Sequence, residues 1–429
     1  MAAPKNISRS PWFWIPTLYL AEGLPNALVA SVSVVLYKNL GVSNADIAFY
    51  TGWLYLPWVI KPFWSPVVDI LKTRRGWIWA MQLLLGAGLA GVALTIPAPH
   101  FFQLTLAFFW LLAFSSATHD IAADGFYLLA TTEREQSYFS GIRSAFYRVA
   151  TIMAQGQLVI LAGRIYARTG NYTAAWSIVF GLVAGLFFCF SLYHWLVLPR
   201  PAADKPGNVL SVDNFFAEFA KTFGSFFLKP QIGVMLAFIL LYRLGEAQLM
   251  KMVQPFLLDP RERGGLGLLN DQLGLIYGTV GVVIFILGAL LGGFAVSRRG
   301  LKFWLWPMLL AIHLPDAVFI WLAYAQPQNL FAIGAGVAIE QFGYGFGFTA
   351  FMLYMIRIAR GEHQTAHYAI CTGFMALGVM LPGMWSGWLQ ELLGYRHFFV
   401  WVIMATIPSF IVAMRIPLEP EFGKRSATN

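Results

Sequence analysis

The segment FFQLTLAFFWLLAFSSATHDIAADGFYLLAT (residues 101–131) combines two features that rarely occur together. It is predominantly apolar, and it exceeds the roughly 20 residues that a helix needs to cross a bilayer. Its second half nevertheless contains His119, Asp120 and Asp124. A charge at mid-bilayer costs about 2.5–3.5 kcal/mol on insertion scales, so we expect these side chains to face the protein interior or a polar cavity.

The rest of the chain has the same apolar character. Hydrophobic residues make up 58% of the sequence and charged residues 11%, against about 25% charged residues in soluble domains. Backbone groups in lipid must pair internally, so the long apolar runs are predicted to be helices rather than open sheets. The sequence predicts an all-α membrane protein with twelve transmembrane helices at about 12–37, 45–68, 77–96, 101–129, 138–164, 174–197, 231–257, 271–296, 302–324, 329–357, 365–392 and 396–415.

The net charge of +9 is explained by orientation in the membrane. If the N terminus is cytoplasmic, 18 of the 29 lysines and arginines fall in cytoplasmic segments and 6 in the opposite loops. This bias predicts that both termini are cytoplasmic, and it gives no reason to expect a nucleic-acid partner. The two cysteines, Cys189 and Cys371, lie in different halves and form no metal-binding pattern, so neither a metal nor a cofactor is predicted.

The sequence divides into two halves with a repeated motif. A polar linker, residues 199–230, separates residues 1–198 from residues 231–429, and its NFFAEFAKTFGSFF portion predicts an amphipathic surface helix. The loops VVDILKTRRGW and FAVSRRGLKFW follow the second helix of each half. Paired six-helix halves with this basic turn indicate the major facilitator fold. We assign a gating or structural role to Asp69, Arg74, Arg75, Arg148, Arg298 and Arg299.

Intramembrane carboxylates recur at regular places. Spans one, four, seven and ten, which open the four three-helix units of such a fold, each carry at least one, and Asp316 lies in span nine. We predict that these groups line one central chamber and couple transport to protons, with Asp120 as the main proton carrier. The alternative for Asp124 is an ion pair with an arginine of span five. The predicted proton-coupling residues are Glu22, Asp120, Asp124, Glu246 and Glu340.

Cationic and aromatic residues in the spans suit an anionic substrate with sugar or ring faces. We predict a substrate site formed by Trp53, Tyr55, Lys61, His119, Arg143, Arg243 and Tyr344. Structural alternatives stay open for three of these. Lys61 has Asp69 eight residues on, Arg243 has Glu246 three residues on, and His119 is equally suited to a hydrogen bond between helices. His119 and Asp124 also match the His-x4-Asp pattern of some acyltransferases, but without the accompanying loop motifs, so no enzyme is predicted.

Four stretches resemble the AmpG-type muropeptide permeases: LYLPWVIKPFWSPVVD (54–69), HDIAADG (119–125), LYRLGEA (241–247) and the glycine-rich helix around Glu340. That group looks related to siderophore permeases and acetyl-CoA transporters. The resemblance implies a major facilitator fold and proton-driven import of anhydro-muropeptides across the inner membrane. The family usually has Gln, Lys and Asp where this chain has His119, Arg243 and Glu246.

These three departures leave the solute open. A permease for a siderophore or another solute is the alternative, and a membrane acyltransferase is a remote one. The expected partners are a small-molecule substrate, protons and the lipid bilayer, and the chain is expected to act as a monomer.

Overall fold

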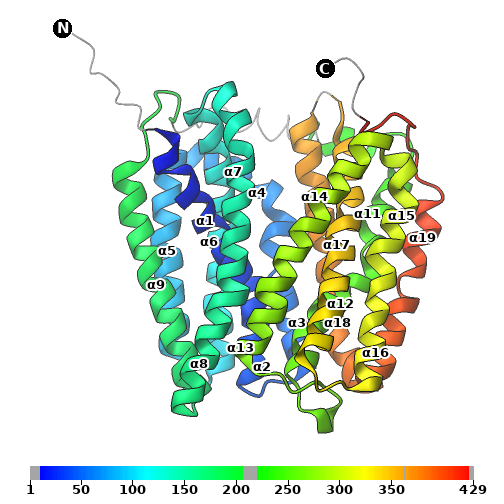
Figure 1. Cartoon of the computed structure of the whole chain (residues 1–429). Helices are drawn as coiled ribbons and strands as arrows, with labels where there is room; N and C mark the ends of the chain where they lie inside the picture. Colours follow the sequence, from blue (N-terminus) through cyan, green and yellow to red (C-terminus); the bar gives the residue numbers. More distant parts are fainter. Residues whose placement is uncertain (1–9, 206–219, 222, 362, 425–429) are drawn as a thin grey trace. The chain divides into compact units, whose positions relative to one another are not determined.

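The computed structural model describes residues 10–205, 220–221, 223–361 and 363–424. The described residues form helices and connecting turns and no strand, which confirms the predicted all-α class (Figure 1). Ten helical stretches in this part of the chain are long and apolar enough, by length and composition, to cross a membrane. The protein is therefore a multi-pass membrane protein.

The ten candidate stretches differ from the twelve predicted spans at two places. The predicted spans 365–392 and 396–415 lie in one 48-residue stretch, Ala366–Ala413. Within it, α18 (Gln364–Met404) is interrupted at Gly394, whose φ of 69° suits glycine and breaks the helix. The predicted span 45–68 corresponds to two shorter helices, α3 (Asn44–Trp53) and α4 (Leu56–Leu71). The number twelve stays a prediction.

The contacts divide the chain into two compact units. Unit 1 comprises residues 1–29, 63–154 and 165–213, and unit 2 comprises residues 30–62, 155–164 and 214–429. This grouping differs from the halves expected from the sequence, because residues 30–62 and 155–164 associate with the second half. The predicted boundaries at 198 and 231 remain a prediction. The predicted surface helix of the linker falls largely outside the described residues.

Unit 1 is built on two sets of packed helices. In it, α5 packs against α6 and α9, and α1 packs against α6 and α7. Glycine allows close packing at Gly91, where a Cβ would lie 2.3 Å from the ring of Phe108. Polar caps start α5 and α7 among these helices: Thr73 caps α5, and Thr132 with Glu135 forms a capping box on α7. The helices are α1 (Ile15–Ala27), α5 (Arg74–Thr95), α6 (Phe101–Ala130), α7 (Glu133–Ile152) and α9 (Tyr172–Val197).

Unit 2 surrounds the long helix α17. Helices α14 and α15 pack against α17, while α3 and α12 pack against α18. Its core contains Phe238, Tyr242, Phe351 and Tyr354, whose rings lie in contact with one another. Besides α3 and α18, its helices are α2 (Ser33–Asn39), α11 (Ile232–Leu241), α12 (Leu244–Leu258), α13 (Asn270–Leu273), α14 (Val282–Arg299), α15 (Leu301–His313), α16 (Ala317–Ala325), α17 (Leu330–Ala359) and α19 (Ile407–Ala413).

Two π-helical segments of unit 2 meet through glycines. The segment Gly274–Gly281 lies against residues 155–158, which end the π-helical segment Met153–Leu158 that leads into α8 (Val159–Thr169). A Cβ on Gly278 would lie 2.0 Å from the carbonyl oxygen of Gln155, and one on Gly156 would lie 2.4 Å from Thr279 Oγ1. Only glycine permits this backbone approach, which joins segments from the two halves of the sequence.

Candidate functional site

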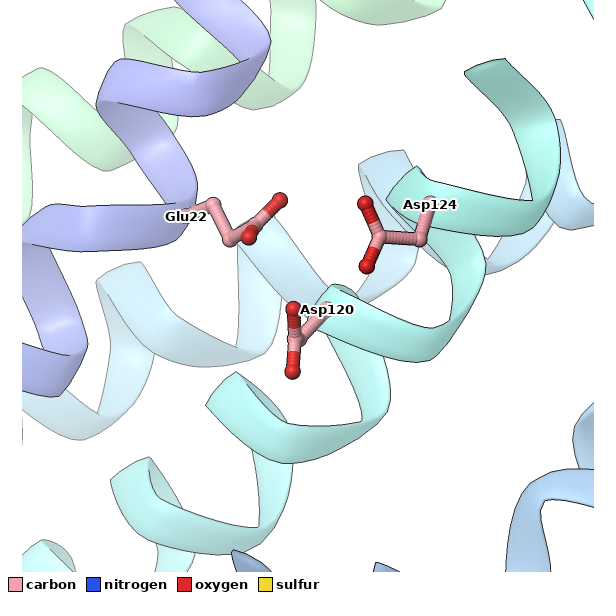
Figure 2. Close-up of side chains that lie close together, drawn as sticks. All are labelled: Glu22, Asp120 and Asp124. Atoms are coloured by element: carbon pink, nitrogen blue, oxygen red, sulfur yellow. The ribbon is translucent and has the colours of Figure 1, made fainter. Parts of the chain in front are cut away.

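Three carboxylates gather in unit 1. Figure 2 shows Glu22 on α1 pointing toward Asp120 and Asp124 on α6. One oxygen from each group lies within 4.8 Å of the others, and Glu22 is buried while the two aspartates are half-buried. Like charges at this spacing repel, so binding a proton or another cation to one group changes the charge balance of all three. We call Glu22, Asp120 and Asp124 the acidic cluster.

Arg143 on α7 holds one edge of the acidic cluster. Its guanidinium pairs with the Asp124 carboxylate, and the Tyr19 hydroxyl donates to the same carboxylate at 3.1 Å. The guanidinium also lies 4.3 Å and 4.2 Å from the ring centroids of Tyr19 and Tyr127. These contacts join α1, α6 and α7. The structure thus places Asp124 in the ion pair that the sequence left open as its structural role.

His119 takes part in a buried chain of hydrogen bonds. The Gln82 amide donates to His119 Nε2 at 2.9 Å, and its oxygen lies 2.9 Å from His194 Nδ1. His194 Nε2 lies 3.0 Å from the Thr17 hydroxyl. The chain crosses α6, α5, α9 and α1 in turn. His119 was predicted to lie in the substrate site, with a hydrogen bond between helices as the alternative. Its contact with Gln82 is such a hydrogen bond.

A second group of charges lies in unit 2. Arg243 donates to both oxygens of Glu246 at 2.7 and 3.2 Å, and to the hydroxyl of Tyr344 at 2.8 Å. Arg243 is 6% exposed and Glu246 is fully buried. A buried charge is stable when it is paired and hydrogen-bonded, and this arginine and glutamate satisfy each other. In this conformation Arg243 therefore forms the ion pair with Glu246 that the sequence left open as its structural alternative.

Two further carboxyl groups lie in electrostatic range of that pair. Glu340 is buried and accepts a hydrogen bond from the Gln341 amide at 2.9 Å. Asp316 is buried, and its carboxyl oxygens have no hydrogen-bond partner among the described residues. Asp316 interacts electrostatically with Glu340 and Glu246, and Tyr55 interacts with Arg243 and Glu246. We call Tyr55, Arg243, Glu246, Asp316 and Glu340 the polar core cluster.

Asp316 was noted in the sequence but not placed in the predicted site, because span nine does not open a three-helix unit. The structure brings Glu22 together with Asp120, and Glu246 within electrostatic range of Glu340. These are two groups, one in each unit. The prediction that all four line a single chamber stays a prediction.

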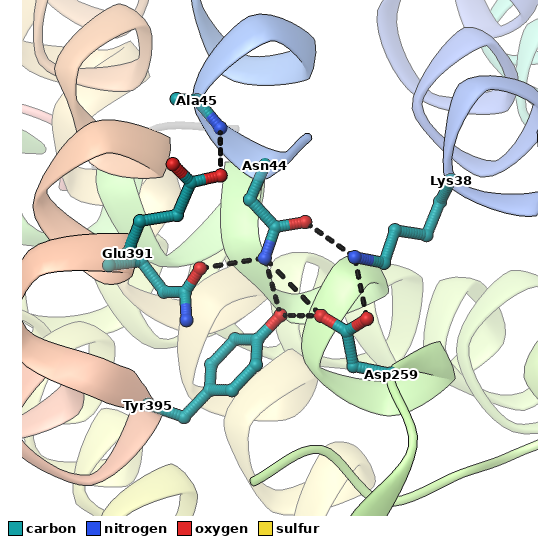
Figure 3. Close-up of polar contacts among 7 residues, drawn as sticks. Lys38, Asn44, Ala45, Asp259, Glu391 and Tyr395 are labelled. Carbon is teal, nitrogen blue, oxygen red and sulfur yellow. Dashed lines mark hydrogen bonds and ion pairs between the residues drawn. The ribbon is translucent and has the colours of Figure 1, made fainter. Parts of the chain in front are cut away.

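A buried polar network lies in unit 2 at the end of the first span (Figure 3). Lys38 Nζ lies 2.6 Å from Asp259 and donates to the Asn44 amide oxygen at 2.7 Å. The Asn44 amide donates to Gln390 at 2.6 Å and to the Tyr395 hydroxyl at 2.9 Å, and Tyr395 donates to Asp259 at 2.6 Å. We call Lys38, Asn44, Asp259, Gln390 and Tyr395 the closure network.

The closure network ties α2 and α3 to the end of α12 and to α18. The side chains of Lys38 and Asp259 are only 13% and 5% exposed. Beside the network, Asn39 and Asn270 exchange two amide hydrogen bonds at 3.1 and 2.6 Å. Sequence reasoning missed this network, because a lysine and an aspartate near helix ends look like ordinary loop charges.

The predicted gating arginines of the first basic turn lie at a defined junction. The backbone N–H groups of Arg74 and Arg75 donate to the Asp204 carboxylate at 2.8 and 3.0 Å. Arg75 also donates to the backbone carbonyl of Leu198 at 3.2 Å. This turn therefore binds the segment that follows α9. The side chain of Asp69 lies outside the described residues.

The remaining predicted residues have more open surroundings. At the end of α14, the exposed Arg298 and Arg299 lie 4.4 and 4.9 Å from the ring centroids of Phe294 and Phe303. Trp53 is 37% exposed. Lys61 and Arg148 are half-buried. None of these three is placed in the acidic cluster or the polar core cluster by the contacts above.

Comparison with known proteins agrees with this arrangement. Residues 21–194 match the BT1 family. The chain is 25% identical over 417 residues to the putative transporter AmpG 4 of Rickettsia conorii, covering 94% of this chain and 95% of that protein. It is 26% identical over 408 residues to the anhydromuropeptide permease of Escherichia coli K12, covering 92% of this chain and 78% of that protein.

The chain is similar to AmpG permeases along more than nine-tenths of its length. Solved structures show which fold the chain shares. A D-xylose-proton symporter matches with a TM-score of 0.71 at 13% identity, covering 96% of this chain and 98% of that one. A bacterial homologue of the human lysosomal transporter Spinster matches with a TM-score of 0.70 at 16% identity, covering 96% of both chains. These likenesses confirm the major facilitator fold, and the named relatives are transporters, which agrees with a chain that is not an enzyme.

Proposed function

We propose that this protein is a proton-coupled symporter that imports an anhydro-muropeptide, or a similar anionic amphiphile, across the cytoplasmic membrane. The similarity to the Escherichia coli anhydromuropeptide permease along 92% of the chain carries the proposal. The protein acts as a monomer with both termini in the cytoplasm. This orientation follows from the excess of lysine and arginine in the segments on that side.

The closure network supports alternating access. Lys38 follows the first span and Asp259 follows the seventh, so both lie on the side opposite to a cytoplasmic N terminus. Substrate entering from outside the cell needs a path there, and in a major facilitator one half rocks against the other to open it. The network joins segments from both halves of the sequence, so it is suited to be an outer gate that is closed in this conformation.

The acidic cluster supports coupling to protons. Arg143 and Tyr19 hold the Asp124 carboxylate, which suits a structural anion. Asp120 lies one helical turn away on α6, beside Glu22. We assign the coupling proton to Asp120, because a proton there relieves repulsion within the acidic cluster while the Arg143–Asp124 pair stays intact. Movement of α1 relative to α6 would then change the affinity for that proton.

Transport by the purified protein tests this function. In proteoliposomes with an acidic outside, labelled anhydro-muropeptide should accumulate, and collapse of the pH gradient should abolish accumulation. Asp120→Asn should still exchange substrate but not concentrate it, whereas the exposed Glu262→Gln should behave as wild type. Uptake of a ferric siderophore with no muropeptide uptake would replace the proposed substrate. Accumulation driven by sodium at equal pH would replace the coupling ion.

A further inference from the structure

Lys251 is a buried cation that the proposed mechanism has not used. It lies on α12, five residues after Glu246, and is 7% exposed. Within the described part of the chain, its ammonium has no hydrogen-bond partner. The ammonium lies beside a ring: its nitrogen is 5.7 Å from the ring centroid of Tyr55. Burying a charge without a partner is costly, so such a residue in a transporter points to a ligand.

The cations at the acidic cluster, in the polar core cluster and in the closure network already have anionic partners. Arg243 binds both oxygens of Glu246, Arg143 is paired with Asp124, and Lys38 is paired with Asp259. An anionic substrate that approached one of these would compete with a carboxylate already in place. Lys251 has no such competitor in hydrogen-bonding distance among the described residues, so its ammonium is the better receptor.

The backbone beside Lys251 supplies an acceptor as well. Pro255 lies inside α12, four residues further on. Proline has no N–H, so the carbonyl of residue 251 lacks its usual helical partner. Prolines in membrane helices are tolerated where such carbonyls are satisfied by other groups. The helix that carries the Lys251 ammonium therefore also has a backbone carbonyl acceptor that its own ladder does not use.

The position of Lys251 connects it to the polar core cluster. Tyr55, the ring beside its ammonium, interacts electrostatically with Arg243 and Glu246. The same helix, α12, carries Glu246 and Lys251. A ligand held at Lys251 would therefore lie beside the charges already assigned to the site, with an aromatic face next to it.

We propose that Lys251 binds a carboxylate of the transported solute, such as that of a peptide stem, and that it selects carboxylates over their neutral amides. The proposal rests on the transport function proposed above and names the group in the solute that is recognised. A hydrogen bond to a charged group is worth about 1.5–3 kcal/mol, so removing the ammonium should weaken carboxylate binding about 10- to 150-fold. Binding of the amide should change little.

The first experiment uses acetate, the simplest carboxylate, and acetamide as its neutral counterpart. Lysines of the full-length purified protein are reductively methylated with ¹³C-formaldehyde, and the Lys251 signal is assigned by its loss in Lys251→Met. Acetate should shift this signal in a saturable way, and acetamide should not. The signal of the exposed Lys302, assigned in the same way, is the control and should stay in place. A Lys251 that never reacts, or a signal that acetate leaves in place, would overturn the proposal.

The second experiment measures binding of anhydro-muropeptide and of its stem amide to wild type, Lys251→Met, Lys251→Arg and Lys302→Met. Wild type, Lys251→Arg and Lys302→Met should prefer the carboxylate, and Lys251→Met should lose that preference. If muropeptide binds but Lys251→Met keeps the preference, the Lys251 assignment fails and the transport proposal stands. If acetate shifts the Lys251 signal while muropeptide does not bind, the anion site stands and the proposed solute fails.

Discussion

Removing the ammonium of Lys38 should open the closure network. Lys38→Met keeps a chain of similar length but leaves Asp259 without its cation, at a site where the two side chains are 13% and 5% exposed. Truncating one partner of a buried ion pair costs about 3–5 kcal/mol. Asp259 keeps its hydrogen bonds from Tyr395 at 2.6 Å and Asn44 at 3.3 Å, so we place the cost at about 2–3 kcal/mol, below that range.

This cost destabilises the closed conformation, in which the Lys38–Asp259 pair is buried. It destabilises an open conformation less, because Asp259 is hydrated there. The ratio of open to closed molecules should therefore rise about 30- to 150-fold, at 1.4 kcal/mol per factor of ten. Replacing both partners, as in Lys38→Met with Asp259→Leu, removes the stranded carboxylate. Apolar replacement of a buried ion pair is often neutral, so the double variant should lie closer to wild type than Lys38→Met does.

A cysteine in place of Thr51 measures the open state. Thr51 is fully buried on α3, and the native Cys189 and Cys371 are first replaced. A membrane-impermeant maleimide applied to intact cells should label this cysteine faster in Lys38→Met, by the ratio given above while the open state stays rare. Lys424→Met breaks an exposed ion pair with Glu421, 3.1 Å long, and should leave the rate unchanged. A labelling rate in Lys38→Met within threefold of wild type, in protein that still folds, would refute the gate.

Three further outcomes are expected. Asp124→Asn should lower thermal stability and yield more than Asp120→Asn does, as measured by melting in detergent, because Asp124 holds Arg143 and Tyr19; the reverse order would contradict the assigned roles. Gly278→Ala should destabilise the protein by about 1–3 kcal/mol, because its Cβ would lie 2.0 Å from the Gln155 carbonyl, whereas Gly293→Ala, with nothing within 4 Å, should melt as wild type. Two hydrogen bonds from Arg357 lower the pKa of Glu419 to about 2, so the Arg357–Glu419 contact is complete above about pH 5 and is lost progressively as the pH falls toward 2. In Glu419→Gln the ion pair is lost at neutral pH as well. A spin label at position 421 should gain mobility in both cases, and no gain in either would contradict this.

The helices were predictable because lipid imposes them. An apolar run that must satisfy its own backbone can only be helical there, and the runs around residues 101–129 and 329–357 became α6 and α17. The breaks were predictable only in part. Gly394, which interrupts α18 through a positive φ, lies between the predicted spans 365–392 and 396–415. The separation of α3 from α4 inside the predicted span 45–68 was not predicted, because the apolar run continues across it.

The candidate site was predictable in its residues more than in its partners. Asp120 and Asp124 are four residues apart, and this spacing alone places them on one face of a helix, but it does not show that Glu22 points toward them. The chain from His119 to Thr17 passes through Gln82 and His194, which look in the sequence like isolated polar residues of apolar spans. Such partners depend on which helix faces meet, and that is decided by packing over the whole fold.

Helix α12 connects the proposed anion receptor to the proposed gate. Lys251 and Asp259 are eight residues apart, which is about 12 Å along a helix, and Pro255 lies midway between them. A ligand shifts a conformational equilibrium only if it binds one state better than the other. A carboxylate at Lys251 adds an anion to the same helix whose end is held by the Lys38–Asp259 pair, so a movement of α12 changes the surroundings of both sites. Substrate binding and gate closure would then be linked through α12. In Lys251→Met, substrate should no longer change the rate at which maleimide labels Thr51→Cys. The labelling rate measured without substrate should stay unchanged.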